Sequence, residues 1–349
     1  MADTAAASLR VPAEKLESFT ARAFQAVGIS APDAKSIAQL MVRADLQGSE
    51  GHGVFRLPQY IRRIKGGAVN LKPNIRVERE AAGMALVDGD NGMGHLVMRF
   101  ATEKAIAKAK TAGVAWVGVK WSNHAGPASL YAAMPLEHDM VGLYLAVGNA
   151  NHLPAWGGLD MLLSTNPIAV AVPAGEESPI VLDMATTVAA YGKVKTKAQR
   201  GETMPEGWMM DREGRPLTDP KRANEGFLLP IGGYKGYGLA LIVDLLAGVL
   251  SGAAYLEHVN SWLDDPGKPG NLGHFFLAID TRVLGSTEWL ARRLADFDAT
   301  IHGTPRADPA VPVRLPGEIE LERLEKHRRE GIAVDPALLA RLEAMATRS

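Results

Sequence analysis

The chain of 349 residues contains no cysteine. This absence excludes disulfide bonds, thiolate metal ligands and a cysteine nucleophile. Net charge is almost absent too, because 38 Lys and Arg stand against 39 Asp and Glu. Such a balance argues against a protein that binds nucleic acid or an anionic membrane through bulk charge. The first residues also lack the apolar run of a signal peptide, so we expect a cytoplasmic protein.

The sequence is otherwise that of an ordinary globular protein, with 47% hydrophobic and 22% charged residues. Its length predicts about two domains. One apolar run, residues 238–256, is about as long as a membrane span. Because Asp244 lies near its middle, where a charge is costly in a bilayer, we predict a buried helix and no membrane segment.

Apolar residues at helical spacing predict two helices over residues 11–47, the second of them starting at Ser30-Ala-Pro-Asp33. A third helix is predicted for residues 55–65, and this opening part of the chain gives no sign of a strand. Further helices are predicted for residues 94–113, 237–250 and 335–345.

Short, apolar, β-branched segments predict strands at residues 84–88, 114–119, 140–146, 168–172, 180–183 and 275–279. We therefore predict a mixed α/β fold with two parts. Residues 11–75 form an N-terminal helical domain that C-terminal helices within residues 318–349 complete. Residues 76–317 form an α/β region of one or two subdomains that binds cofactor and substrate.

Several common motifs of enzyme sites are missing. No Gly-x-Gly-x-x-Gly string lies between a strand and a helix, so nucleotide binding of the Rossmann type is not predicted. The phosphate-binding loop of nucleotide hydrolases and the serine elbow of hydrolases are absent as well. No two histidines have the spacing of a zinc-binding helix, and we predict no metal site.

His52 and Arg56 are the first candidate site residues. Their spacing places them one turn apart on the face of a helix. An imidazole can transfer a proton near neutral pH, and a guanidinium can bind a carboxylate with two hydrogen bonds. The pair suits a substrate with an acid group next to a carbonyl or hydroxyl. The alternative is that His52 caps the loop and Arg56 forms a surface ion pair.

Three further polar residues lie at the ends of predicted strands or helices, where binding and catalytic groups are often found. His124 follows a predicted strand in a turn, either as a functional group or as a loop hydrogen bonder. Lys235 precedes an apolar helix in a glycine-rich loop, which indicates either an anion site suited to pyrophosphate or a solvated lysine. Asp183 ends a strand and either accepts a partner's N–H or caps the next helix.

Several short strings occur in order along the chain: His52-Gly-Val-x-Arg56, Ser122-Asn-His124-x-Gly126, Thr165-Asn-Pro167, Asp183-Met-Ala-Thr-Thr-Val188 with Tyr191-Gly-Lys193, Pro205-x-Gly-Trp208 and Lys235-Gly-Tyr-Gly-Leu239. Together they resemble the malate/L-lactate dehydrogenase family of the second type, which includes ureidoglycolate dehydrogenase, sulfolactate dehydrogenase, diketogulonate reductase and piperideine-2-carboxylate reductase. The resemblance extends from about Leu16 to Gly331.

The resemblance implies an oxidoreductase that uses NAD or NADP on a non-Rossmann scaffold and works as a homodimer with its active sites between domains. It would transfer a hydride between the nicotinamide and C2 of a small 2-hydroxy or 2-oxo acid, such as malate, lactate or ureidoglycolate. His52 and His124 are then equal candidates for proton transfer, and Arg56 binds the carboxylate. The residues implied to contact the cofactor are Asn149, Asp183, Met184, Ala185, Lys235, Gly236, Arg293, Leu315, Pro316 and Gly317.

One departure from the family pattern is Gly51, which stands where a serine is usual before the first histidine. The sequence leaves open the acid that is used, the choice between NAD and NADP, and the direction of the reaction. Two alternatives remain beside the main interpretation. One is an NAD(P)H-dependent reductase of a cyclic imino acid, and the other is a non-redox lyase or binding protein on the same scaffold.

Overall fold

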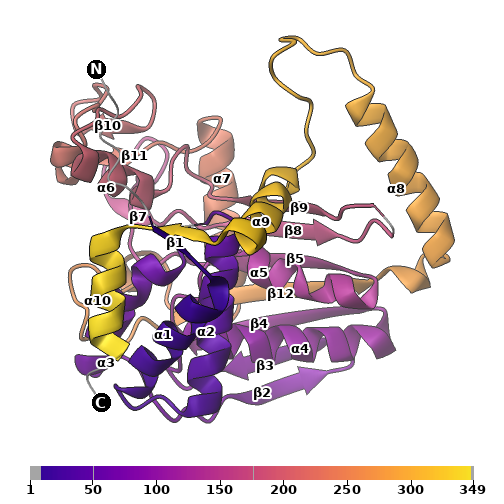
Figure 1. Ribbon diagram of the computed structural model, residues 1–349, viewed down its shortest axis with the longest axis horizontal. Helices are drawn as coiled ribbons and strands as arrows, with labels where there is room; N and C mark the ends of the chain where they lie inside the picture. The colour runs from indigo at the N-terminus through magenta and orange to yellow at the C-terminus, as the bar shows by residue number, and fades with distance from the viewer. Residues whose placement is uncertain (1–8, 50, 176, 347–349) are drawn as a thin grey trace.

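A computed structural model describes residues 9–346 with the exception of residues 50 and 176 (Figure 1). The α-helices are α1 (Ala13–Gln25), α2 (Ala31–Leu46), α3 (Leu57–Lys65), α4 (Gly94–Ala112), α5 (Ser129–Ala132), α6 (Tyr191–Arg200), α7 (Tyr234–Val243), α8 (Thr287–His302), α9 (Glu318–Glu330) and α10 (Pro336–Ala346). The strands are β1 (Leu9–Val11), β2 (Arg76–Ala81), β3 (Met84–Asp88), β4 (Val114–Ser122), β5 (Met140–Ala146), β6 (Leu153–Pro154), β7 (Met161–Leu163), β8 (Ile168–Val172), β9 (Ile180–Met184), β10 (Met209–Asp211), β11 (Gly226–Leu228), β12 (Leu272–Asp280) and β13 (Ile332–Val334).

Helices from the two ends of the chain share one core. Ser30 caps α2 by accepting the N–H of Asp33, as the sequence predicts. Buried side chains of α1, α2 and α3 pack with those of α9 and α10, among them Phe24, Met41 and Leu342. In Figure 1 the indigo strand β1 lies beside the yellow C-terminal segment, where β1 pairs with β13 in an antiparallel ribbon. The prediction that the opening part lacks a strand is wrong at β1, because three residues give no periodicity of their own.

The central sheet has seven strands in the order β2-β3-β4-β12-β5-β8-β9. Strands β3 and β4 are parallel and joined by α4, whereas each other neighbouring pair in this sheet is antiparallel. A Rossmann sheet is mostly parallel and binds dinucleotides at the turn between a strand and the following helix. The mixed α/β prediction is confirmed, and the topology accounts for the missing glycine fingerprint.

The two faces of the sheet are covered by different helices. Helices α4 and α5 cover one face, and α7 with the π-helical turn η4 (Asp244–Val249) packs Val243 and Ala247 against the other. The prediction of a buried helix over residues 238–256 is wrong, because the helix ends at η4 and its outer side chains are uncovered in this chain. Ile242 is 51% exposed and Leu250 is 60% exposed. Within the described residues, no helix combines the length and the apolar character that crossing a membrane requires.

Two parts stand apart from the sheet. Helix α6, strands β10 and β11 and the short helix η3 (Pro220–Glu225) form a small lobe around Val194, Met209 and Leu228. Helix α8 and the segment after it extend away from the sheet (Figure 1). No residue of α8 is fully buried. No sequence pattern predicted α6 or α8.

Candidate functional site

A cavity of about 1620 Å³ opens at one end of the sheet. Residues of β5, β9 and β12 line it, together with the residue just before β8 and the segment just after β4, because antiparallel neighbours bring strand ends and strand starts to the same edge. The turn before α3, the first residues of α6 and the start of α9 complete its wall. His52, Arg56 and His124 all line this cavity, although they come from different parts of the chain.

The turn that carries His52 depends on a glycine. Asp45 of α2 accepts the N–H of Val54 at 2.9 Å, and its carboxylate lies against Gly53. A Cβ atom at position 53 would fall 1.9 Å from Oδ1 of Asp45, so only glycine fits. The short helix η1 (Val54–Arg56) begins after His52. The expectation that His52 and Arg56 lie one turn apart on a helix is therefore wrong in geometry, although both side chains reach the same cavity.

Arg56 is held by three contacts. Its Nε donates to the carbonyl oxygen of Gly51 at 2.7 Å, and its Nη1 donates to Gln59 at 2.9 Å. Its Cζ lies 5.3 Å from the ring centroid of Trp262. Nη2 has no hydrogen-bond partner among the described residues, and Arg56 forms no ion pair with them.

The two imidazoles lie together beside Arg56. The rings of His52 and His124 stack with centroids 5.7 Å apart, and His124 also stacks on Trp262 at 4.7 Å. Tyr60 donates its hydroxyl proton to Nδ1 of His124 at 2.5 Å, and the N–H of Gly126 points at the same nitrogen at 3.4 Å. These donors assign the proton of neutral His124 to Nε2.

Burial sets the charge state of this cluster. It lowers the pKa of His52 to about 4, and the charge of Arg56 adds to the effect. It also places the pKa of His124 well below its usual value, with His52 and Arg56 as further causes. Burial raises the pKa of Tyr60, which therefore remains a hydroxyl. Two neutral imidazoles thus stand beside one buried cation, and a bound anion would raise the pKa of both.

Part of the predicted cofactor set lines the cavity. Asn149, Asp183, Met184, Ala185, Pro316 and Gly317 do so. One observation fits a bound dinucleotide, because Nδ2 of Asn149 is buried without a hydrogen-bond partner among the described residues. Gly317 has φ 100° and packs against β9, where a Cβ would be 3.0 Å from the nitrogen of Val181, so the turn before α9 requires glycine.

Four members of that set are not among the residues that line the cavity: Lys235, Gly236, Arg293 and Leu315. Lys235 lies in the first turn of α7, and Gly236 packs its Cα against Ile231, where a Cβ would fall 2.2 Å from the carbonyl oxygen. Arg293 lies on α8 with its Cζ 5.4 Å from the ring of Trp289. Asp183 accepts the N–H of Ser129 at 2.8 Å, which is the first of its two expected roles.

Sequence reasoning missed other residues around the cavity. Tyr60 follows Arg56 by four residues, so helical spacing could have identified it. No sequence pattern predicted that Trp262 packs against His124 and Arg56. His152 stacks on Tyr191 with ring centroids 3.9 Å apart, and both line the cavity with Lys195 of α6.

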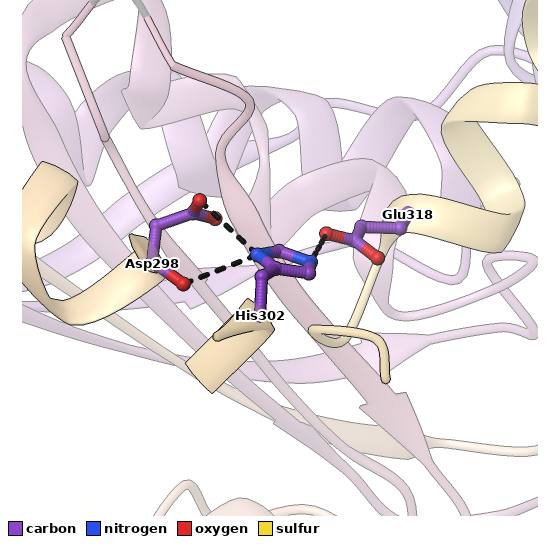
Figure 2. A group of neighbouring side chains, drawn as sticks. All are labelled: Asp298, His302 and Glu318. Atoms are coloured by element: carbon purple, nitrogen blue, oxygen red, sulfur yellow. Dashed lines mark hydrogen bonds and ion pairs between the residues drawn. The ribbon is translucent and has the colours of Figure 1, made fainter. Parts of the chain in front are cut away.

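A second histidine cluster lies away from this cavity. Figure 2 shows His302, the last residue of α8, between Asp298 of the same helix and Glu318 at the start of α9. Its Nδ1 lies 3.1 Å from a carboxylate oxygen of Asp298, and its Nε2 lies 2.8 Å from Glu318. These ligand atoms are close enough to hold a metal ion. Because each ring nitrogen already faces a carboxylate, a protonated histidine satisfies the group without a metal.

Comparison with known proteins identifies the family of this chain. A family model described as malate/L-lactate dehydrogenase matches residues 11–343. The chain belongs to the malate/L-lactate dehydrogenase family. Malate dehydrogenase from Pyrococcus horikoshii is 37% identical over 348 residues, which cover 97% of this chain and 95% of that protein. Ureidoglycolate dehydrogenase (NAD(+)) from Escherichia coli K12 is 30% identical, over 93% of each protein.

Solved structures of the family have the same fold. Malate dehydrogenase from Pyrococcus horikoshii OT3 matches with a TM-score of 0.89 and 35% identity, over 100% of this chain and 97% of that one. Delta1-piperideine-2-carboxylate reductase from Pseudomonas syringae pvar. tomato matches with a TM-score of 0.87 and 30% identity, over 97% of this chain and 100% of the other. The family expected from the sequence motifs is confirmed.

Proposed function

We propose that this protein is an NAD(P)-dependent dehydrogenase that acts on the CH–OH group of small 2-hydroxy acids, with reduction of the 2-oxo acids as its reverse reaction. The observation that carries the proposal is the meeting of one guanidinium and two imidazoles around Trp262 in a single large cavity. Membership of the malate/L-lactate dehydrogenase family supports the same reaction class.

Arg56 binds the substrate carboxylate through its unengaged Nη2, and its hydrogen bonds to Gly51 and Gln59 keep it in place. His52 and His124 are equal candidates for taking the proton of the C2 hydroxyl in the oxidation and returning it in the reduction. Tyr60 occupies Nδ1 of His124, which leaves Nε2 for the substrate, and His52 stacks on His124. Buried groups fixed in this way stabilise charge on the C2 oxygen without reorganisation.

The nicotinamide of NAD or NADP, when bound, would supply the redox chemistry at C2. Asn149, Met184 and Gly317 are the residues of the cavity that we assign to holding the dinucleotide, together with Asp183, Ala185 and Pro316. Lys235, Gly236, Arg293 and Leu315 remain proposed contacts on the strength of the family resemblance alone.

A thermal-shift comparison tests the cofactor and then the substrate. NAD(H) and NADP(H) are each added to the protein, and the cofactor that raises the melting temperature is used with a panel of 2-hydroxy and 2-oxo acids. We expect one cofactor to stabilise the protein and its absorbance at 340 nm to change with at least one acid. Absence of both effects with every acid contradicts the proposal.

A second candidate substrate is a cyclic imino acid, whose carboxylate Arg56 would bind in the same manner. The structural match to delta1-piperideine-2-carboxylate reductase favours this candidate. Parallel assays with pyruvate and with a cyclic imine separate the two reactions. Turnover of the imine alone would replace the 2-oxo acid assignment.

We also propose that the protein is a cytoplasmic homodimer, with residues 11–75 and 318–349 as one domain and residues 76–317 as the other. The outer face of α7 and η4 supports dimerisation, because its exposed side chains are apolar and follow helical spacing: Leu239, Ile242, Leu245, Val249 and Leu250. Light scattering tests this assignment. Ile242→Glu should convert a dimer to a monomer, and a monomeric wild type would refute the dimer.

A further inference from the structure

Tyr60 of α3 reaches the substrate cavity only through another side chain. It is 3% exposed and is not among the residues that line the cavity, whereas His124 is. The Tyr60 hydroxyl lies 2.5 Å from Nδ1 of His124, and the N–H of Gly126 points at the same nitrogen. Because Nδ1 accepts both, the proton of the neutral ring is on Nε2. The Tyr60 hydroxyl is therefore connected to the substrate by the two nitrogens of one imidazole.

This arrangement makes neutral His124 a poor proton donor by itself. A neutral imidazole that gives up its Nε2 proton becomes an anion, unless Nδ1 gains a proton in the same step. Protonation of the ring beforehand is also unfavourable, because burial places the pKa of His124 well below its usual value. The donor that lies at Nδ1 with a proton to give is the Tyr60 hydroxyl.

Two guanidiniums favour negative charge on the Tyr60 oxygen. Arg56 precedes Tyr60 by four residues and Arg63 follows it by three, so the helix brings both to the side of Tyr60. Burial raises the pKa of Tyr60, and the charges of Arg56 and Arg63 each oppose that rise. Arg63 is 4% exposed and forms no ion pair with a described residue. Its Nη2 donates to Asn123, the residue before His124, at 3.0 Å. A tyrosinate would thus meet cations that are already in place.

A second tyrosine–histidine pair in the protein lacks such cations. The Tyr144 hydroxyl lies 2.7 Å from Nδ1 of His274. Burial raises the pKa of Tyr144, and the charge of Asp183 raises it further. The same hydrogen bond therefore occurs in two electrostatic settings, and only the setting of Tyr60 favours loss of the hydroxyl proton.

We propose that Tyr60 and His124 form a proton relay, in which Tyr60 replaces the proton that His124 gives to the C2 oxygen when the 2-oxo acid is reduced. The Nε2–H bond of His124 breaks as the O–H bond of the product forms. The O–H bond of Tyr60 breaks in turn, and its proton forms the Nδ1–H bond. His124 is neutral before and after, and the negative charge of the alkoxide passes to the Tyr60 oxygen beside Arg56 and Arg63. Oxidation of the hydroxy acid uses the same bonds in reverse.

The inference rests on the proposed function and selects His124 from the two candidate imidazoles. Tyr60 touches no substrate, so it is a positioning residue that also holds a proton. The charged or titratable groups that act on the pair are His52 and Arg56 before α3, Arg63 on α3, His95 on α4 and His274 on β12. Burial lowers the pKa of His52 to about 4 and that of His95 and His274 to about 3, so these three are neutral at pH 7.

The pH dependence of the reduction tests the relay in Tyr60→Phe, with kcat/KM measured for the best 2-oxo acid between pH 6 and pH 8. The wild type should vary little over this range, because Tyr60 keeps its hydroxyl proton. In the variant only a protonated His124 can give up its Nε2 proton and become neutral, and the protonated fraction falls about tenfold per pH unit above its pKa. The ratio of variant to wild type should fall by the same factor, with a loss of about 10² to 10⁴ at pH 8.

Tyr131→Phe is the matched control. Tyr131 is fully buried, does not line the cavity, and donates its hydroxyl to the carbonyl oxygen of Ala125, which follows His124. This variant loses a hydrogen bond to the same turn but no proton source, so any change in its kcat/KM should be equal at every pH. Thermal melts show whether both variants are folded.

A ratio of Tyr60→Phe to wild type that is constant with pH would give Tyr60 a structural role alone and overturn the relay. Unchanged kinetics in Tyr60→Phe would overturn it too. The wild type provides a test that needs no variant. If its kcat/KM for the reduction already falls about tenfold per pH unit between pH 6 and pH 8, a protonated His124 is the donor and the relay is refuted.

Failure of the relay differs from failure of the proposed function. If His124→Ala has the kcat of the wild type, the proton moves without His124, and the relay is refuted while the dehydrogenase assignment stands. A wild type that reduces neither a 2-oxo acid nor a cyclic imine with NADH or NADPH refutes both.

Discussion

The two histidine clusters of this protein respond to their surroundings in opposite ways. His52 and His124 lie half-buried beside Arg56 in the cavity, and the pKa of each falls. His302 lies between Asp298 and Glu318 at the surface, where burial alone would lower its pKa but the two carboxylates together raise it. The residue type is the same, so the sign of the neighbouring charge and the access of water decide whether the pKa of the imidazole rises or falls. Neutral imidazoles suit proton transfer in the cavity, whereas the His302 ring, when protonated, joins α8 to α9 through Asp298 and Glu318.

Removing one imidazole from the cavity gives the largest expected effect. His52→Ala or His124→Ala should lower kcat by about 10² to 10⁴ for whichever residue transfers the proton. The loss should be smaller for the other residue. Steady-state kinetics with the best acid measure both variants, and a thermal melt checks that each is folded. A kcat equal to that of the wild type in both variants would show that neither imidazole transfers the proton.

Changing the cation of the same cluster is the next test. Arg56→Lys keeps the charge but loses the planar fork and the hydrogen bonds to Gly51 and Gln59. We expect KM for the acid to rise about 10- to 100-fold, as for loss of a charged hydrogen bond. A KM equal to that of the wild type with every acid tested would show that Arg56 does not bind the carboxylate.

Buried histidines should make folding sensitive to acid. Burial lowers the pKa of His95 and His274 to about 3, whereas the unfolded chain binds these protons near pH 6.5. The unfolded state therefore gains protons first, and stability should fall as the pH drops from 6.5 towards 3. At about 1.4 kcal/mol per pKa unit, each group contributes several kcal/mol across this range.

Urea unfolding of the wild type and of His95→Leu, measured between pH 7 and pH 4.5, tests this dependence. The variant lacks one titrating group and should lose stability less steeply. Equal slopes for the two proteins would mean that His95 is protonated in the folded state.

The surface cluster should show the opposite sign. Because the folded pKa of His302 is raised, its stabilisation is complete below about pH 6.5 and is lost as the pH rises through the folded value. His302→Gln should melt at a lower temperature than the wild type at pH 6 and at the same temperature at pH 9. A difference that is constant with pH would mean that the ion pairs with Asp298 and Glu318 contribute nothing.

The smallest expected effect is at Gly51. A Cβ at this position meets no atom within 4 Å, and its φ is not in the left-handed region. Gly51→Ser should therefore change the free energy of unfolding by less than about 0.5 kcal/mol. Chemical denaturation measures the change. A larger loss would show that the turn before His52 depends on glycine here as it does at Gly53.

Local patterns predicted most of the sheet. Strands β3, β5 and β8 occupy the predicted residues, and the last helix begins as expected, with Asp335 accepting the N–H of Leu338. Strand β1 escaped prediction because it is stable only when paired with β13 from the other end of the chain. The exposure of Ile242 was not predicted either, because an apolar run has the same sequence pattern whether the rest of its chain buries it or leaves it exposed.

The family, the strand-forming segments and the residue types of the site could be predicted from the sequence, because motifs and periodicity depend on neighbours along the chain. The contacts of Tyr60 with His124, and of Trp262 with both Arg56 and His124, depend on the tertiary structure. These contacts join residues far apart in sequence. Burial and the charge of such distant neighbours set the protonation of the imidazoles, and no local pattern encodes either.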